Sequence, residues 1–190
     1  MSRDNILQAA ASIFQEKGYH ATSMQDIAEA VDLKKGSLYH HVNSKQEILL
    51  ALLDEALGLI VERLESVLSP DLSPSQKLRR VMHAYLGFLT ENRSLSSVLL
   101  LEYRSLEPEF KDLHIPSRDQ VDHIWQKIIE EGVSQGEFQT LDPGLTSKAL
   151  LGVLNWTITW YREDGPLSAE EIADRFTDLF LQGLYIREGD

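Results

Sequence analysis

Hydrophobic positions recur at spacings of three and four along almost the whole chain of 190 residues. This spacing places apolar side chains on one face of an α-helix, whereas a half-buried strand would alternate at every second position. Capping residues, prolines and glycines separate the apolar stripes from one another. The pattern predicts an all-α fold of about nine helices.

The first fifty residues predict three short helices. The first is expected to end at Gly18, and the second to begin at a capping box formed by Thr22 and Gln25. A tight turn at residues 32–35 leads into a third helix over residues 36–41. Two helices joined in this way are typical of a helix-turn-helix, whose second helix enters the major groove of DNA.

A long amphipathic helix is predicted over residues 45–68, and the chain breaks at residues 69–74. The helix links two parts of the chain. We expect residues 1–46 to form a DNA-binding domain, and residues 47–190 to form a larger domain for ligand binding and dimerisation.

The later helices have recognisable starts. Pro116 is expected to begin one helix and residues 142–143, Asp-Pro, the next. Ser168 and Glu171 form a capping box that is expected to begin the last helix.

The formal net charge of −12 is unusual for a protein that binds nucleic acid. The first fifty residues, however, carry five Lys or Arg against six Asp or Glu, whereas the remainder carries 13 against 24. Three of those five basic residues lie within residues 34–45. Phosphate contact depends on local charge, so the overall acidity does not argue against DNA binding.

Other functions lack their sequence signatures. The chain has no cysteine, and its six histidines show no metal-ligand spacing, so no metal site is expected. It has no nucleophile–base pair and no phosphate loop, so we expect neither an enzyme nor a cofactor beyond an effector ligand. A basic leader and an apolar stretch of about 18 residues are both missing, which predicts a cytoplasmic protein without membrane contact.

The chain resembles the TetR family of bacterial transcriptional regulators over most of its length. The most specific segment is residues 36–45, Gly-Ser-Leu-Tyr-His-His-Val-Asn-Ser-Lys, supported by residues 18–19 and 22–28. The family often has an aromatic residue where Val42 stands. The resemblance implies a homodimer that binds a palindromic operator in double-stranded DNA. Together with side-chain chemistry, it predicts DNA contacts from Thr22, Lys34, Lys35, Gly36, Ser37, Tyr39, His40, His41 and Lys45.

The chemistry agrees with these roles. The Thr22 hydroxyl at a helix start and the Lys45 ammonium suit phosphate, whereas Ser37 and His40 suit base edges. Alternatives remain open. Tyr39 can instead pack against the first helix, His41 can be a partly buried structural histidine, and the two lysines before Gly36 can be solvated turn residues.

A second informative stretch is residues 152–173, with Asn-Trp-(x)3-Trp-Tyr-Arg before Gly-Pro-Leu-Ser. This stretch and residues 100–106 resemble a TetR branch that senses acyl-CoA thioesters and regulates fatty-acid or lipid degradation. The implied effector is a long-chain acyl-CoA that releases the repressor from DNA. The expected ligand-binding residues are Met82, Tyr85, Leu86, Leu89, Leu99, Tyr103, Arg104, Trp125, Asn155, Trp156, Thr159 and Arg162.

Other interpretations of the same stretch stay open. Trp156 can belong to a dimer interface, and Arg162 can form a surface salt bridge with Glu163 or Asp164. The acidity of this part of the chain opposes a polyanionic ligand and suits a lipophilic cation, as in a repressor of a multidrug efflux gene. A scaffold protein would also be helical, but it would not need exposed side chains at residues 39–41.

Overall fold

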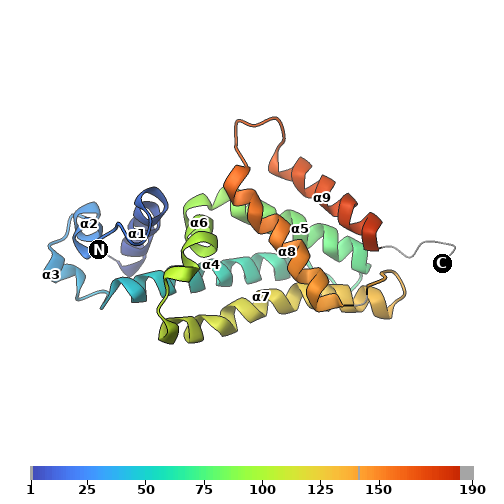
Figure 1. The fold of residues 1–190 in the computed structure, drawn as a ribbon, viewed down its shortest axis with the longest axis horizontal. Coiled ribbons are helices and arrows are strands. Elements are labelled where there is room, and N and C mark those ends of the chain that lie inside the picture. Colours follow the sequence, from blue (N-terminus) through green and yellow to red (C-terminus); the bar gives the residue numbers. More distant parts are fainter. Residues whose placement is uncertain (1, 141, 185–190) are drawn as a thin grey trace. The chain divides into compact units, whose positions relative to one another are not determined.

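The computed structural model describes residues 2–140 and 142–184 (Figure 1). Within them the fold is all-α, as predicted, with nine α-helices, one short 3-10 helix and no β-strand. The helices are α1 (Arg3–Lys17), α2 (Met24–Ala30), α3 (Lys35–Leu38), α4 (Lys45–Val67), α5 (Pro74–Glu91), α6 (Arg93–Glu102), η1 (Tyr103–Ser105), α7 (Pro108–Ser134), α8 (Pro143–Trp160) and α9 (Ala169–Leu184).

The chain forms two compact units that interleave along the sequence. Unit 1 comprises the residues up to Gly58 together with Asn92–Ser117, and unit 2 comprises Leu59–Glu91 and the residues from Arg118 onward. Helices α4 and α7 therefore contribute residues to both units. The functional boundary expected after residue 46 stays a prediction.

Unit 1 is built around α1, which packs against α2 and α6. The apolar face of α1 is buried through Ile6, Ala10 and Phe14. Leu38 and Val42 are buried as predicted, at 0% and 1% exposure. Although Val42 is smaller than an aromatic residue, it fills its core position and anchors the segment that follows α3.

Unit 2 is organised around α5, which packs along α9 and also against α8. Leu86 of α5 meets Ile172 and Ala173 of α9 in one apolar cluster. At the surface beside it, Arg79 of α5 pairs with Asp174 and Asp178 of α9. Apolar burial along α5 supplies most of the stabilisation here, because exposed ion pairs contribute little.

Several predicted helix ends are confirmed. Gly18 ends α1 with a φ of 81°, a conformation that favours glycine. Asp142 caps α8 by accepting a hydrogen bond from the backbone of Leu145. Ser168 and Glu171 form the expected capping box before α9.

The predicted start at Pro116 is wrong, because α7 begins at Pro108 and continues through Pro116. Pro108 occupies the first helical position, where a missing N–H costs nothing. The carbonyl of Glu107 accepts the first hydrogen bonds of the helix, from Phe110 and Lys111. Pro116 then removes only one hydrogen bond from a long helix whose packing holds it together.

The end of α7 depends on a close approach between Gly132 and Phe138. The backbone N–H groups of Glu137 and Phe138 both donate to the Gly132 carbonyl, and Gly136 has a φ of 71°. The Phe138 ring lies so close to Gly132 that a Cβ there would overlap it. Gly132 is therefore needed for space, although it lies in a helix.

We predict that Gly132→Ala destabilises the protein by about 1–3 kcal/mol, because the buried ring must move. Gly58→Ala is the matched control, since nothing lies within 4 Å of a Cβ at that helical position. The control should gain about 0.5–1 kcal/mol. Urea denaturation measures both, and equal stability of the two variants would contradict the prediction.

Candidate nucleic-acid interface and effector site

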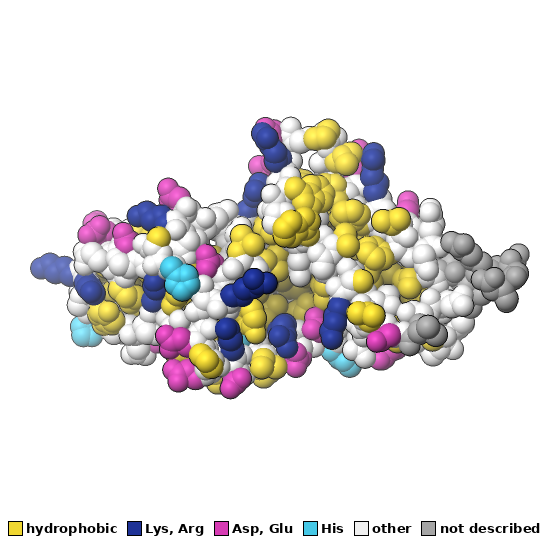
Figure 2. Space-filling view, in the orientation of Figure 1, with side chains coloured by type: hydrophobic (Ala, Val, Ile, Leu, Met, Phe, Trp, Pro, Cys, Tyr) yellow, Lys and Arg dark blue, Asp and Glu magenta, His cyan; other side chains and the backbone are white. Residues whose placement is uncertain are grey.

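The end of unit 1 at α3 carries a set of exposed polar and aromatic side chains. Lys34 caps the helix, and the segment from there to residue 41 is exposed except for Leu38 and the half-buried Ser37. Tyr39 is 44% exposed. Figure 2 shows basic and histidine side chains over α3. The set presents cations, hydroxyls and imidazoles on one short segment, which suits phosphate and base-edge contact.

One of the alternative interpretations does not fit this arrangement, because His41 is exposed and is therefore not a partly buried structural histidine. The other stays open, because a tyrosine that is 44% exposed can still pack against α1. Lys34 and Lys35 are exposed to solvent. Lysines in a turn and lysines at a phosphate-binding surface would both be exposed, so their exposure does not decide between these two interpretations. The DNA contacts of these residues stay predictions.

The capping box of α2 lies one residue later than predicted. Ser23 accepts a hydrogen bond from the backbone of Asp26, and the Asp26 carboxylate accepts one from the backbone of Ser23. The hydrogen bonds from Ser23 lower the pKa of Asp26 to about 2. The assignment to Thr22 and Gln25 is therefore wrong, because the side chains of Ser23 and Asp26 make the two reciprocal hydrogen bonds instead.

Thr22 is held inside the unit. It is only 2% exposed, and its hydroxyl donates to the Gly18 carbonyl over 2.9 Å. The side chain thus ties the α1–α2 turn together in this structure. Its predicted phosphate contact is untested.

Lys45 is also engaged with the protein. Its ammonium donates to the carbonyls of Tyr19, at 2.8 Å, and Thr22, at 2.6 Å. It lies 4.2 Å from the centre of the Tyr19 ring, and burial lowers its pKa. Lys45 therefore fastens the start of α4 to the α1–α2 turn with two charge-assisted hydrogen bonds. These two bonds use two of the three N–H groups of the ammonium. The predicted contact of Lys45 with a phosphate stays a prediction, and the third N–H could make it.

Glu102 holds the same turn from α6. Its carboxylate accepts hydrogen bonds from the Tyr19 backbone, at 3.1 Å, and from the Ser105 hydroxyl, at 3.0 Å. Burial, followed by the charges of Glu107 and Glu102, raises the pKa of Tyr19 to about 12. No local pattern predicted this contact, because Tyr19 and Glu102 lie 83 positions apart.

In unit 2, the structure brings three of the predicted ligand residues together. Tyr85 donates its hydroxyl hydrogen to Oδ1 of Asn155 over 2.6 Å. The Tyr85 and Trp125 rings meet edge to face, with centroids 5.6 Å apart. Burial, and then the charge of Asp122, raises the pKa of Tyr85. This cluster joins α5, α7 and α8 within an apolar core.

Trp125 is unusual within this cluster. It is 0% exposed, and its Nε1 has no hydrogen-bond partner among the described residues. A buried donor without an acceptor costs about 1–3 kcal/mol. Tryptophan is normally placed where its N–H reaches a partner, so this position needs an explanation.

The other predicted ligand residues are distributed more widely. Met82, Leu86 and Leu89 are buried on α5, and Leu86 faces α9. A separate group belongs to unit 1, namely Leu99, Tyr103 and Arg104. The two predicted arginines thus fall into different units, Arg104 into unit 1 and Arg162 into unit 2.

The end of α8 is largely exposed. Trp156 is 67% exposed, and the Thr159 hydroxyl donates to the Trp156 carbonyl. Arg162 pairs with Asp164 at 3.1 Å, and both side chains are open to solvent. The surface salt bridge that was the alternative for Arg162 is therefore present. Trp156 remains available for a ligand or for an interface.

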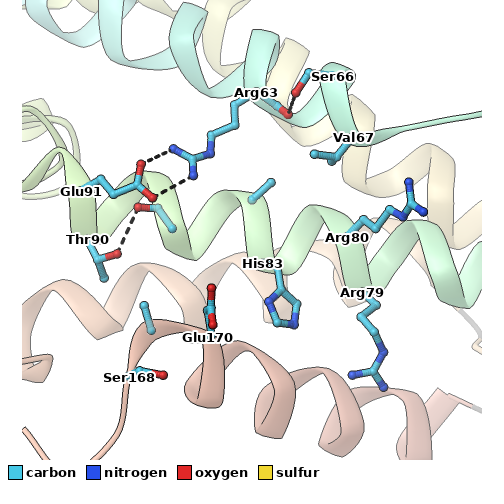
Figure 3. Close-up of a pocket in the computed structure, with 13 residues that line it drawn as sticks. Arg63, Ser66, Val67, Arg79, Arg80, His83, Thr90, Glu91, Ser168 and Glu170 are labelled. Carbon is cyan, nitrogen blue, oxygen red and sulfur yellow. Dashed lines mark hydrogen bonds and ion pairs between the residues drawn. The ribbon is translucent and has the colours of Figure 1, made fainter.

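A polar cleft of about 870 Å³ lies between α4, α5 and the start of α9 (Figure 3). Its basic side chains were not predicted as a site, and most of them are paired. Arg63 forms two hydrogen bonds with Glu91, and His83 lies 2.9 Å from Asp174. Arg80 is the exposed exception. The cleft offers little uncompensated positive charge for a large anion.

Metal-binding clusters and membrane-spanning helices are both absent from the described part of the chain. No group of three or more His, Asp or Glu side chains is placed to hold a metal ion there. No helix of the described residues is long and apolar enough to cross a membrane.

Two protein-family models match the chain, one in its N-terminal part and one in its C-terminal part. Residues 6–52 match the model "Bacterial regulatory proteins, tetR family", and residues 71–184 match "Tetracyclin repressor-like, C-terminal domain". The chain is 30% identical to the HTH-type transcriptional repressor KstR2 of Mycolicibacterium smegmatis, over 99% of this chain and 93% of that protein.

Two solved structures are similar over nearly their full lengths. The TetR family regulator PfmR from Thermus thermophilus is 42% identical, with a TM-score of 0.86 over 94% of this chain and 98% of that one. AibR in complex with isovaleryl coenzyme A and operator DNA is 27% identical, with a TM-score of 0.87 over 93% of this chain and 96% of that one.

We predict that Lys45→Met destabilises the protein by about 1.5–3 kcal/mol, because two backbone carbonyls lose a charged donor while the aliphatic stem remains. Lys35→Met is the control, since Lys35 is exposed and makes no side-chain hydrogen bond or ion pair in the described structure. Its unfolding temperature should stay within a degree or so of the wild type. Circular dichroism measures the unfolding temperature of each variant. Equal unfolding temperatures for Lys45→Met and Lys35→Met would refute the structural role of Lys45.

Proposed function

Because the chain belongs to the TetR family of bacterial regulatory proteins, we propose that it is a homodimeric repressor released from a palindromic operator by a small-molecule effector. Membership also confirms that the chain is a DNA-binding transcriptional regulator and not an enzyme. The observation that carries the proposal is the exposed polar segment at α3, held in place by Leu38 and by the Lys45 contacts.

In the proposed complex, this segment enters the major groove. Lys34 and Lys35 neutralise phosphates, and Tyr39 offers its hydroxyl to phosphate and its ring to a thymine methyl. Ser37 and His40 meet base edges. In a dimer, the two segments read half-sites about 34–36 Å apart, or a larger helical multiple of that distance.

The proposed dimer uses the exposed apolar surface of unit 2. Leu145 and Trp156 on α8 and Leu179 on α9 are each more than 60% exposed. Figure 2 shows hydrophobic side chains gathered over α8. Two copies of these helices would bury this surface in a four-helix bundle. A monomer would leave it in water, where such patches favour association.

The proposed effector is a long-chain acyl-CoA, and the regulated genes serve fatty-acid or lipid degradation. The similarity to AibR, whose structure contains isovaleryl coenzyme A, supports this ligand class. The apolar core around Tyr85, Trp125 and Asn155 suits the acyl group. Arg162 is the exposed cation proposed for the coenzyme, in exchange for its contact with Asp164.

Release requires that the effector binds one conformation better than another. We propose α4 as the connecting element, because it carries Lys45 at its start in unit 1 and Arg63 near its end in unit 2. An effector that shifts α4 would move the α1–α2 turn through the Lys45 hydrogen bonds. The half-site spacing would then change and operator affinity would fall.

A repressor of a multidrug efflux gene that senses lipophilic cations is the second candidate. The observation in its favour is Asp122, whose charge acts on Tyr85 beside the ring of Trp125. A carboxylate next to two aromatic rings is a suitable environment for an organic cation.

We predict that Tyr39→Ala weakens operator binding about tenfold or more without changing its dependence on salt, because a hydroxyl and a ring are lost but no charge. Lys35→Ala should weaken binding and also reduce the slope of log affinity against log salt by about one. Fluorescence anisotropy with a DNA duplex from upstream of the protein's own gene measures the affinity and its dependence on salt. Glu16→Ala on α1 is the control. Undiminished binding by both variants would rule out α3 as the DNA-contacting element.

We predict that long-chain acyl-CoA stabilises the protein, while CoA and free fatty acid do not. A ligand of the native state at 100 times its dissociation constant adds about 2.7 kcal/mol. A thermal-shift panel of acyl-CoAs, CoA, fatty acids and lipophilic cations measures this directly. Stabilisation by the cations alone would replace the acyl-CoA proposal with the second candidate.

A further inference from the structure

The starting point is the unpaired indole N–H of Trp125 in the core of unit 2. Its Nε1 has no partner among the described residues, and the side chain has no surface that a water molecule can reach. A bound water therefore does not satisfy this donor in the present conformation. Phenylalanine would fill a similar apolar position without leaving a donor unpaired, so packing alone does not account for the indole.

One neighbouring side chain, the half-buried Asn155, also has spare donors. Tyr85 uses its only hydroxyl hydrogen on Oδ1 of Asn155, and the Asn155 amide nitrogen has no protein hydrogen-bond partner in the described structure, although solvent reaches this side chain. Trp125 lies against the ring of that same tyrosine. Two helices, α7 and α8, thus bring spare N–H donors to the ring and hydroxyl of Tyr85 on α5. A complementary ligand atom is a hydrogen-bond acceptor without a hydrogen of its own.

The surroundings define the rest of the ligand. Val121, Ile128 and Ile129 lie three or four positions from Trp125 along α7, on the same face of the helix, and all three are buried. A ligand that places an acceptor inside an apolar region is an apolar chain or ring that carries a carbonyl oxygen. Since the region is closely packed, such a ligand binds only when the helices separate. Binding to the more open state would then shift the conformational equilibrium.

We propose that Trp125 Nε1–H donates a hydrogen bond to the carbonyl oxygen of the effector, with the Asn155 amide as the second donor. This inference rests on the proposed function for the location of the effector in unit 2. It goes further by assigning Trp125 as the residue that distinguishes a carbonyl-bearing ligand from the same ligand without a carbonyl. Its test does not depend on coenzyme A, because a simple ketone carries the same acceptor.

The first experiment follows the tryptophan indole signals in ¹⁵N–¹H spectra of the wild-type protein. Trp160→Phe and Trp125→Phe assign the signals, and the exposed indole of Trp160 serves as the internal control. The probes are a medium-chain 2-alkanone and the alkane of equal length. The ketone should shift the Trp125 indole proton downfield and slow its exchange with solvent, while the alkane should not. An unchanged Trp125 signal with the ketone and with acyl-CoA overturns the inference, whether or not any variant folds.

The second experiment pairs a change in the ligand with a change in the protein. Wild-type protein should bind acyl-CoA about three- to tenfold more tightly than the S-alkyl-CoA thioether of equal length, the size expected for one hydrogen bond. Trp125→Phe should bind the two equally, and Trp160→Phe should keep the preference. A preference that survives in Trp125→Phe overturns the inference and leaves the acyl-CoA proposal intact. A ketone response without any CoA binding supports the inference and overturns the acyl-CoA proposal instead.

Discussion

The contact between the Lys45 ammonium and the carbonyls of Tyr19 and Thr22 joins the start of α4 to the α1–α2 turn, and α2 and α3 lie in the chain between these two points. A charge that is partly withdrawn from water needs strong acceptors, and two backbone carbonyls and an aromatic face supply them. Glu102 binds the N–H of the same Tyr19 from α6, so the turn is held from two elements. The segment that follows α2 can therefore be short, because groups elsewhere in unit 1 hold the turn before α2 and the start of α4.

Local signals explain why much of the fold was predictable. Gly18, Asp142 and the pair Ser168 and Glu171 act through hydrogen bonds within four positions, so their effect is visible in the sequence. At the start of α2 the sequence predicted a capping box of Thr22 and Gln25, whereas the structure forms it one position later, from Ser23 and Asp26.

Contacts between distant positions were not predictable in the same way. The roles of Lys45 and Glu102 depend on a turn that lies 23 to 83 positions away. An unpaired donor such as Trp125 Nε1 is a property of the whole surrounding core, which no periodicity reveals. The pairing of Arg162 with Asp164 was visible as an alternative only because the partner is two positions away.

The two helices shared by both units change unit next to residues that weaken a helix. Helix α4 passes from one unit to the other after Gly58, and α7 does so after Ser117, the residue that follows Pro116. Glycine has the largest backbone freedom, and proline leaves the carbonyl four positions earlier without its helical partner. Each of the two helices therefore carries a residue of low helix propensity within two positions of the point where it leaves unit 1. A bend at either point would leave the hydrogen bonds and the packing inside each unit intact.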